Sequence, residues 1–147
     1  MRERLVENIL AHSKGKNWEI AKWERRVYEI YYSKVAMECL CWQKNIKNIC
    51  VIQHKQTEKL CIIWNECIHH FLNKDYDYLF KDIKKLLKDG KQAVSEKTLN
   101  YIQSHGIADK GTCWMYGLYR RRRLEFSHPQ MRIRTNVNKA FLNACYK

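Results

Sequence analysis

Proline and glycine are scarce in this chain of 147 residues, which contains one proline and five glycines. So low a content excludes collagen-like chains and disordered chains rich in these two residues. Acidic residues are also few, because 15 Asp and Glu stand against 28 Lys and Arg and leave a net charge of +13. A positive excess of this size favours an anionic partner, such as nucleic acid, an anionic membrane surface or an acidic protein.

Long apolar runs are absent as well. Cys61-Ile-Ile-Trp64 is typical of the longest, far short of the roughly 18 residues of a membrane span. The first residues, Met1-Arg-Glu-Arg-Leu-Val-Glu7, are charged and lack the apolar region of a secretory signal. Seven cysteines, an odd number, fit a reducing compartment better than a disulfide framework. We therefore expect an intracellular protein without a membrane span.

Apolar residues, by contrast, are abundant: 46% of the chain is hydrophobic and 12% is aromatic, which is enough for a core. The length indicates a single domain over residues 1–147, with a helical core over 1–110 and a basic aromatic segment plus a C-terminal helix over 111–147. Apolar spacings of three and four residues predict a mainly α fold of about five to six helices. Only the basic segment, up to about residue 135, is expected to be irregular or short β.

Apolar spacing and capping residues predict where these helices lie. The clearest apolar face, at i, i+3 and i+4 positions, belongs to a helix over residues 57–71. The other expected helices run from about residue 5 to near Gly15, from 17 to about 42, over 75–89, from 95 to 106 and over about 136–146. In this scheme Ser95 caps the start of a helix, and Gly90 and Gly106 each follow the end of one.

The positive charge is concentrated in residues 111–147, which hold eight Lys and Arg against Glu125 alone. Arginine binds phosphate through two parallel donors, and an aromatic ring stacks on an unpaired base. The sequence therefore predicts a nucleic-acid-binding protein for RNA or single-stranded DNA, because no recognition-helix motif for duplex is present. The predicted contacts are Arg120, Arg121, Arg122, Arg123, Arg132, Arg134, Trp114, Tyr116 and Tyr119.

Other interpretations of this segment stay open. Short arginine clusters are typical of nuclear localisation signals, and aromatic residues at helical spacing are typical of a core. A protein-interaction adaptor would bind an acidic host or viral partner and use the arginine run for nuclear import. A membrane-surface protein would need an amphipathic helix, which the segment lacks. If the arginine run is a nuclear localisation signal, alone or in an adaptor, the host nucleus is the expected location.

A second group of candidate residues combines cysteine and histidine. Cys50, His54, Cys67 and His70 follow the pattern Cys-x3-His-x12-Cys-x2-His, in which two helices would supply two ligands each. We therefore consider zinc as a cofactor, with a core of buried free thiols as the alternative. The Cys39-x-Cys41 pair is a weaker candidate, because side chains two residues apart on a helix point in different directions.

Signatures of catalysis are few. The sequence contains no glycine-rich phosphate loop, no Gly-x-Ser-x-Gly motif and no His-Glu-x-x-His motif. Cys113 with His105 or His128 would offer thiol chemistry, but each of these residues fits a structural role better. We expect a protein that is not an enzyme.

One short motif points to a family. Gly111-Thr-Cys113-Trp-Met-Tyr116 is followed by the arginine run and by the expected C-terminal helix. This arrangement resembles the Gly-x-Cys-x-x-Tyr core of the small non-structural nucleoproteins of parvoviruses, the NP accessory proteins of the bocaparvovirus and chaphamaparvovirus groups. The resemblance covers about residues 111–123. It implies a viral accessory protein of the host nucleus that supports genome replication and the processing of viral transcripts, and it carries over no catalytic residues.

Overall fold

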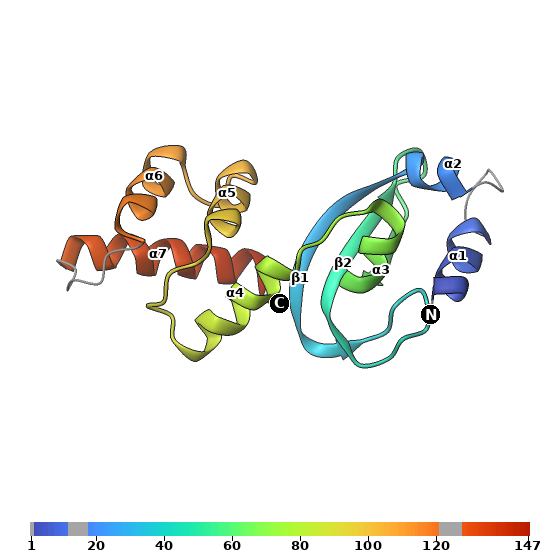
Figure 1. Ribbon diagram of the computed structural model, residues 1–147, viewed down its shortest axis with the longest axis horizontal. Coiled ribbons are helices and arrows are strands. Elements are labelled where there is room, and N and C mark those ends of the chain that lie inside the picture. The colour runs from blue at the N-terminus through green and yellow to red at the C-terminus, as the bar shows by residue number, and fades with distance from the viewer. Residues whose placement is uncertain (1, 12–17, 121–127) are drawn as a thin grey trace. The chain divides into compact units, whose positions relative to one another are not determined.

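The computed structural model describes residues 2–11, 18–120 and 128–147 of the chain. The chain divides into two compact units, unit 1 over Met1–Tyr76 and unit 2 over Asp77–Lys147. Figure 1 shows helices and a small sheet in unit 1, and helices throughout the described part of unit 2. Three predicted phosphate contacts, Arg121, Arg122 and Arg123, lie outside the described residues.

Unit 1 is built on an antiparallel sheet of three strands in the order β1-β2-β3. Its elements are α1 (Arg2–Ala11), α2 (Trp18–Trp23), β1 (Arg25–Met37), β2 (Ile46–His54), β3 (Leu60–Trp64) and α3 (Asn65–Leu72). The central strand pairs with both neighbours, since Cys50 lies opposite Ile30 on one side and Ile63 on the other. Residues 49–54 of β2 are all buried, so both faces of this strand belong to the core.

The expectation of a mainly α fold with β structure only near the C-terminus is wrong, because residues 25–64 form this sheet. Most of the helix expected over residues 17–42 is strand β1. Its segment Val27-Tyr-Glu-Ile-Tyr-Tyr32 is rich in β-branched and aromatic residues, which favour a half-buried pleated surface. The helix expected over residues 57–71 is β3 followed directly by α3, a junction that keeps apolar side chains at helical spacing.

Unit 2 consists of α4 (Asp77–Lys88), α5 (Glu96–Ser104), α6 (Lys110–Tyr119) and α7 (His128–Cys145). The long helix α7 packs along α4 and α6 (Figure 1), and Phe80, Ile83 and Phe141 are fully buried among the helices. The segment expected to be irregular or β is therefore largely helical where the structure describes it. Pro129 stands in the first turn of α7, where its missing N–H group is not needed.

The two ends of α5 confirm local predictions. The Ser95 hydroxyl accepts a hydrogen bond from the Thr98 N–H group and caps α5. Gly106 follows α5 with a φ of 66°, a left-handed conformation that glycine adopts easily. The buried carboxylate of Asp82 accepts hydrogen bonds from the Ser95 N–H and hydroxyl groups, which joins α4 to the start of α5. Among the described residues, no helix has both the length and the apolar character that a membrane crossing requires.

Candidate metal centre and candidate nucleic-acid interface

Three buried cysteines meet in unit 1. Cys39 and Cys41 lie in the loop after β1, and Cys67 lies in α3; we call these three residues the thiol cluster. Their sulfur atoms all lie within 4.8 Å of one another, and the Cys39 and Cys67 sulfurs are 3.7 Å apart. In a tetrahedral zinc site with Zn–S bonds of about 2.3 Å, the sulfurs lie roughly 3.8 Å apart. The thiol cluster could therefore hold a metal ion.

The backbone fixes the loop that carries Cys39 and Cys41. The Leu40 N–H group donates to the Ile62 carbonyl of β3 at 3.0 Å, which ties the loop to the sheet. Trp42 has a φ of 73°, a left-handed conformation that is uncommon for residues other than glycine. In this turn the thiols of Cys39 and Cys41, two residues apart in sequence, both lie close to the thiol of Cys67.

Hydrogen bonds make Cys39 the most acidic thiol of the cluster. The hydrogen bond between the Cys39 and Cys67 sulfurs lowers the pKa of Cys39 from 9.0 to about 6, against the opposing effect of burial. The backbone N–H groups of Cys41 and Trp64, which donate to the Cys39 sulfur, act in the same direction. The hydrogen bond with Cys39 raises the pKa of Cys67, and burial raises the pKa of Cys41. The lowered pKa of Cys39 favours its thiolate, the form of cysteine that binds metals.

Of the four predicted zinc ligands, Cys67 alone belongs to the thiol cluster. Cys50 is buried in the central strand, where burial raises its pKa. Both ring nitrogens of His54 are occupied, because Nδ1 accepts from two backbone N–H groups at 3.2 Å and Nε2 lies 3.4 Å from Glu24 Oε2. His70 is exposed on α3, three residues after Cys67.

Cys39 and Cys41, the weaker candidates in the sequence, lie in a loop and not on the expected helix. In a helix two side chains at i and i+2 diverge, whereas the loop after β1 lets both sulfurs approach one point. The pair could have been identified from the sequence only if β1 had been predicted. A Cys-x-Cys pair in the loop after a strand can direct both side chains to the same point.

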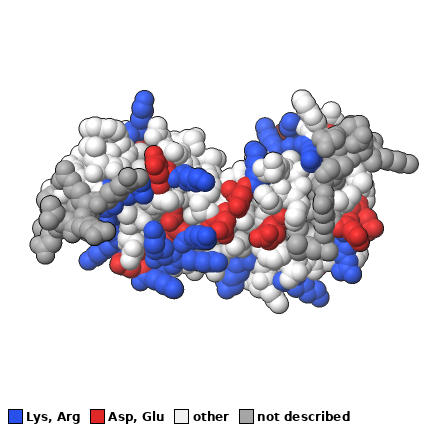
Figure 2. Space-filling model, viewed as in Figure 1, with Lys and Arg blue, Asp and Glu red and all other residues white. Residues whose placement is uncertain are grey.

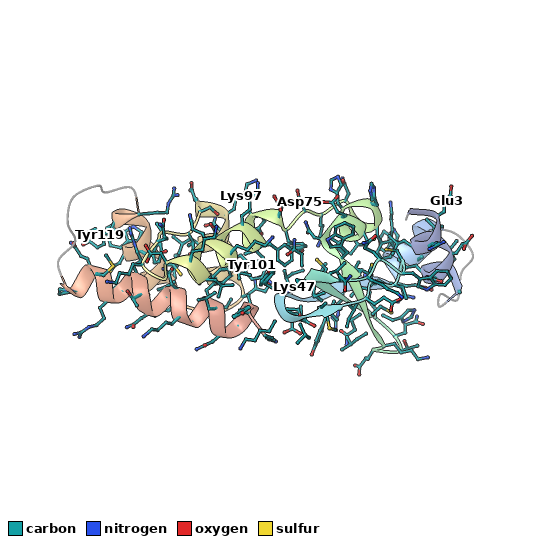
Figure 3. All side chains as sticks on the ribbon, turned by 90° about the horizontal axis from the view of Figure 1, so that it is seen from below. Glu3, Lys47, Asp75, Lys97, Tyr101 and Tyr119 are labelled. Atoms are coloured by element: carbon teal, nitrogen blue, oxygen red, sulfur yellow. The ribbon has the colours of Figure 1, made fainter. Side chains whose placement is uncertain are left out.

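In unit 2, α5 and α6 form a groove of about 520 Å³, which we call the α5/α6 groove. Trp114 projects from α6 with 65% of its surface exposed, and Arg120 lies with its Nη2 atom 3.9 Å from Glu96 Oε2. Figure 3 shows Lys97 and Tyr101 on α5 and Tyr119 at the end of α6. The lining residues are Glu96, Leu99, Asn100, Gln103, Lys110, Cys113, Trp114, Gly117, Leu118 and Arg120.

Two other predicted contacts, Tyr116 and Arg134, instead hold unit 2 together. The buried Tyr116 hydroxyl donates to Asn138 Oδ1 at 2.8 Å and accepts from the Val94 N–H group at 2.9 Å, and burial raises its pKa. Arg134 donates to the carbonyl of half-buried Tyr119 at 3.0 Å, and its guanidinium lies 5.8 Å from the centre of the Tyr116 ring. The Tyr116 side chain and the Arg134 guanidinium therefore make contacts within unit 2.

Positive charge is concentrated in unit 2. Residues 77–147 hold 15 Lys and Arg against 6 Asp and Glu, a net charge of +9, whereas residues 1–76 hold 13 against 9, a net charge of +4. Basic side chains gather over α4 in Figure 2. Exposed members on the helices of unit 2 are Lys81, Lys84, Lys88, Lys97, Lys110, Arg132 and Lys139.

Comparisons with protein-family models, with curated proteins and with solved structures each find no match. Function is therefore inferred from the chemistry of the thiol cluster and of the α5/α6 groove.

Proposed function

We propose that this chain is a non-catalytic protein that binds single-stranded RNA or DNA in the α5/α6 groove. The observation that carries the proposal is Trp114, a 65% exposed side chain in a groove that also holds Lys110 and Arg120. An indole offers an unpaired base a face for stacking, and neighbouring cations attract the phosphates.

The rest of the groove suits the same ligand. Amide side chains of Asn100 and Gln103 can both donate and accept hydrogen bonds at the edges of a base. Leu99 and Leu118 add apolar contact area. The volume of about 520 Å³ is of the size that small-molecule sites have. The charge of +9 on unit 2 raises the local concentration of a polyanion. A base within a duplex is already stacked and paired, so we expect preference for single strands.

We also propose, from the resemblance to parvoviral NP proteins, that this binding supports genome replication or transcript processing in the host nucleus. The motif from Gly111 to Tyr116 lies on α6, the helix that supplies Trp114 to the groove. Trp114, the residue that carries the proposed binding, therefore lies within the motif that carries the resemblance.

Fluorescence anisotropy with short single-stranded RNA, single-stranded DNA and duplex DNA tests the proposal. Trp114→Ala should weaken single-strand binding about 5- to 150-fold, because stacking on one aromatic side chain contributes roughly 1–3 kcal/mol. Trp23→Ala, which removes a 77% exposed tryptophan from unit 1, should leave affinity unchanged. Equal affinities of the wild type and Trp114→Ala would contradict the proposal and assign the groove to a protein partner instead.

For the thiol cluster we propose zinc as the bound ion. Zinc combines a strong affinity for thiolates with a tetrahedral geometry, which the 3.7 Å distance between the Cys39 and Cys67 sulfurs suits. Elemental analysis of protein purified under reducing conditions should give about one zinc ion per chain. A Cys39→Ser/Cys41→Ser double variant should lose the ion. A wild-type protein that contains no zinc, even after incubation with zinc, would show that these residues are buried free thiols of the core.

A further inference from the structure

The thiol cluster leaves a tetrahedral ion with one position to fill. Zinc in structural sites almost always has four ligands, and the cluster supplies three. Cys39, Cys41 and Cys67 are each at most 2% exposed, so bulk water has little access to the ion. A side chain beside the cluster is therefore a better fourth ligand than solvent.

His70 lies on the same helix as Cys67, a member of the cluster. The two residues are three positions apart in α3, so their Cβ atoms are neighbours on the helix surface, about 5–6 Å apart. A zinc ion spans such a distance, with a bond of roughly 2.3 Å to sulfur and one of about 2.0 Å to an imidazole nitrogen. Because His70 is exposed, with its ring beside that of His69, its side chain can change rotamer without disturbing the core.

The neighbouring alternatives fit less well. His69 follows Cys67 by two residues, so its side chain leaves the helix in a different direction. Cys50 is fully buried in β2, whose backbone is fixed by pairing with strands on both sides. A fourth thiolate would also leave a net charge of −2 around a buried Zn²⁺ ion, whereas a neutral imidazole leaves −1.

We propose that His70 is the fourth ligand of a zinc site formed by Cys39, Cys41, Cys67 and His70. This inference rests on the proposed binding of zinc by the thiol cluster. The remaining charge of −1 is offset in part by the backbone N–H groups of Cys41 and Trp64, which donate to the Cys39 sulfur at 3.4 and 3.2 Å. The site would therefore fix α3 to the loop after β1.

Cobalt substitution in the metal-free full-length chain tests this ligand set, because the visible and charge-transfer bands of Co²⁺ report its geometry and its number of sulfur ligands. The wild type should give the spectrum of a tetrahedral ion with three sulfurs and one nitrogen. His70→Ala should change that spectrum and weaken zinc binding about 100-fold in competition with a chelator. His69→Ala is the matched control and should retain the wild-type spectrum and affinity.

A cysteine at the same position gives a second, independent result. His70→Cys should restore tight binding, with the stronger charge-transfer bands of four thiolates. Circular dichroism checks the fold of each variant, and we expect it to be retained because both histidines are exposed.

The possible outcomes distinguish the role of His70 from the proposed binding of zinc by the thiol cluster. If the wild type binds neither Zn²⁺ nor Co²⁺, zinc binding fails and the role of His70 fails with it. If the wild type binds one ion and His70→Ala matches His69→Ala, zinc binding stands and the assignment of His70 is wrong. A four-sulfur spectrum in the wild type, lost in Cys50→Ala, would overturn the assignment in favour of Cys50.

Discussion

Units 1 and 2 differ in the chemistry that their cores and surfaces offer. Unit 1 contains five of the seven cysteines, three of which meet beside a buried β-strand. Unit 2 joins its helices through buried polar side chains, Asp82 and Asn138, and carries a net charge of +9 against +4 for unit 1. The proposed metal binding and the proposed nucleic-acid binding therefore lie in different parts of the chain. Each function should be removable while the other is measured.

Removal of the metal ion should have the largest effect, and the effect should be confined to unit 1. A ligand that binds only the folded state, at a free concentration 1,000 times its Kd, contributes about 4 kcal/mol of stability. Treatment with a chelator should therefore increase hydrogen exchange in β2 and α3 and leave α5, α6 and α7 unchanged, as followed by mass spectrometry of peptides. An equal loss of protection in both units would contradict the division.

Asn138→Ala should have the next largest effect, and it should be confined to unit 2. The Asn138 amide donates to the carbonyls of Gly90 and Gln92 at 2.9 and 2.8 Å and accepts from the Tyr116 hydroxyl. Its removal leaves buried groups without a partner, which should lower the free energy of unfolding by about 3 kcal/mol. Urea unfolding measures the change, with Asn136→Ala, an exposed position on α7, as the control. Similar stabilities of the two variants would refute this role.

Tyr116→Phe sharpens the distinction between structural and binding residues within unit 2. The variant removes the hydroxyl that accepts from the Val94 N–H group, so stability should fall by about 1–2 kcal/mol. Because Tyr116 is 2% exposed, affinity for single-stranded RNA should stay unchanged, in contrast to Trp114→Ala. Denaturant unfolding and anisotropy on the same samples give both values. A loss of RNA affinity like that of Trp114→Ala would show that stacking is not centred on Trp114.

A further expected effect is a pH dependence of the stability of metal-free unit 1. The pKa of Cys39 is about 6 in the folded state, below its ordinary value of 9.0, so the unfolded chain binds more protons between these values. The stability that Cys39 contributes is fully present above pH 9 and is lost as the pH falls through 6. Urea unfolding of the metal-free chain at pH 6, 7 and 8 should show that the free energy of unfolding increases with pH. In Cys39→Ser this increase should be smaller. An equal increase of the free energy of unfolding with pH in the wild type and in Cys39→Ser would contradict the assignment of the thiolate to Cys39.

The fold of unit 2 could be predicted in part because its signals are local. Ser95 and Gly106 mark the two ends of α5 by their own backbone preferences. Unit 1 could not be predicted in this way, because strand pairing between β1 and β2 outweighs the helical spacing of apolar residues in the sequence. At the junction of β3 and α3 the same spacing continues through a change of secondary structure, so periodicity alone cannot locate the boundary.

The candidate sites show the same limit. Cys39 and Cys67 are 28 residues apart in sequence, and they meet only when α3 packs against the sheet. Within the basic segment, the sequence could not separate Trp114 from Tyr116 while the segment was expected to be irregular or β. Once α6 is known to be a helix, its phase explains the difference: Tyr116 faces the core, and Trp114 and Leu118 face the groove.

The salt dependence of single-stranded RNA binding tests the central claim most directly. If Lys110 and Arg120 each neutralise one phosphate, a plot of log K against log salt concentration should have a slope of about −1.4 or steeper. Lys110→Ala should make that slope shallower by about 0.7. We predict this change in Lys110→Ala, and none in Lys22→Ala, which removes a lysine of unit 1. A slope near zero in the wild type, or the same slope in Lys110→Ala, would contradict the assignment of nucleic-acid binding to the α5/α6 groove.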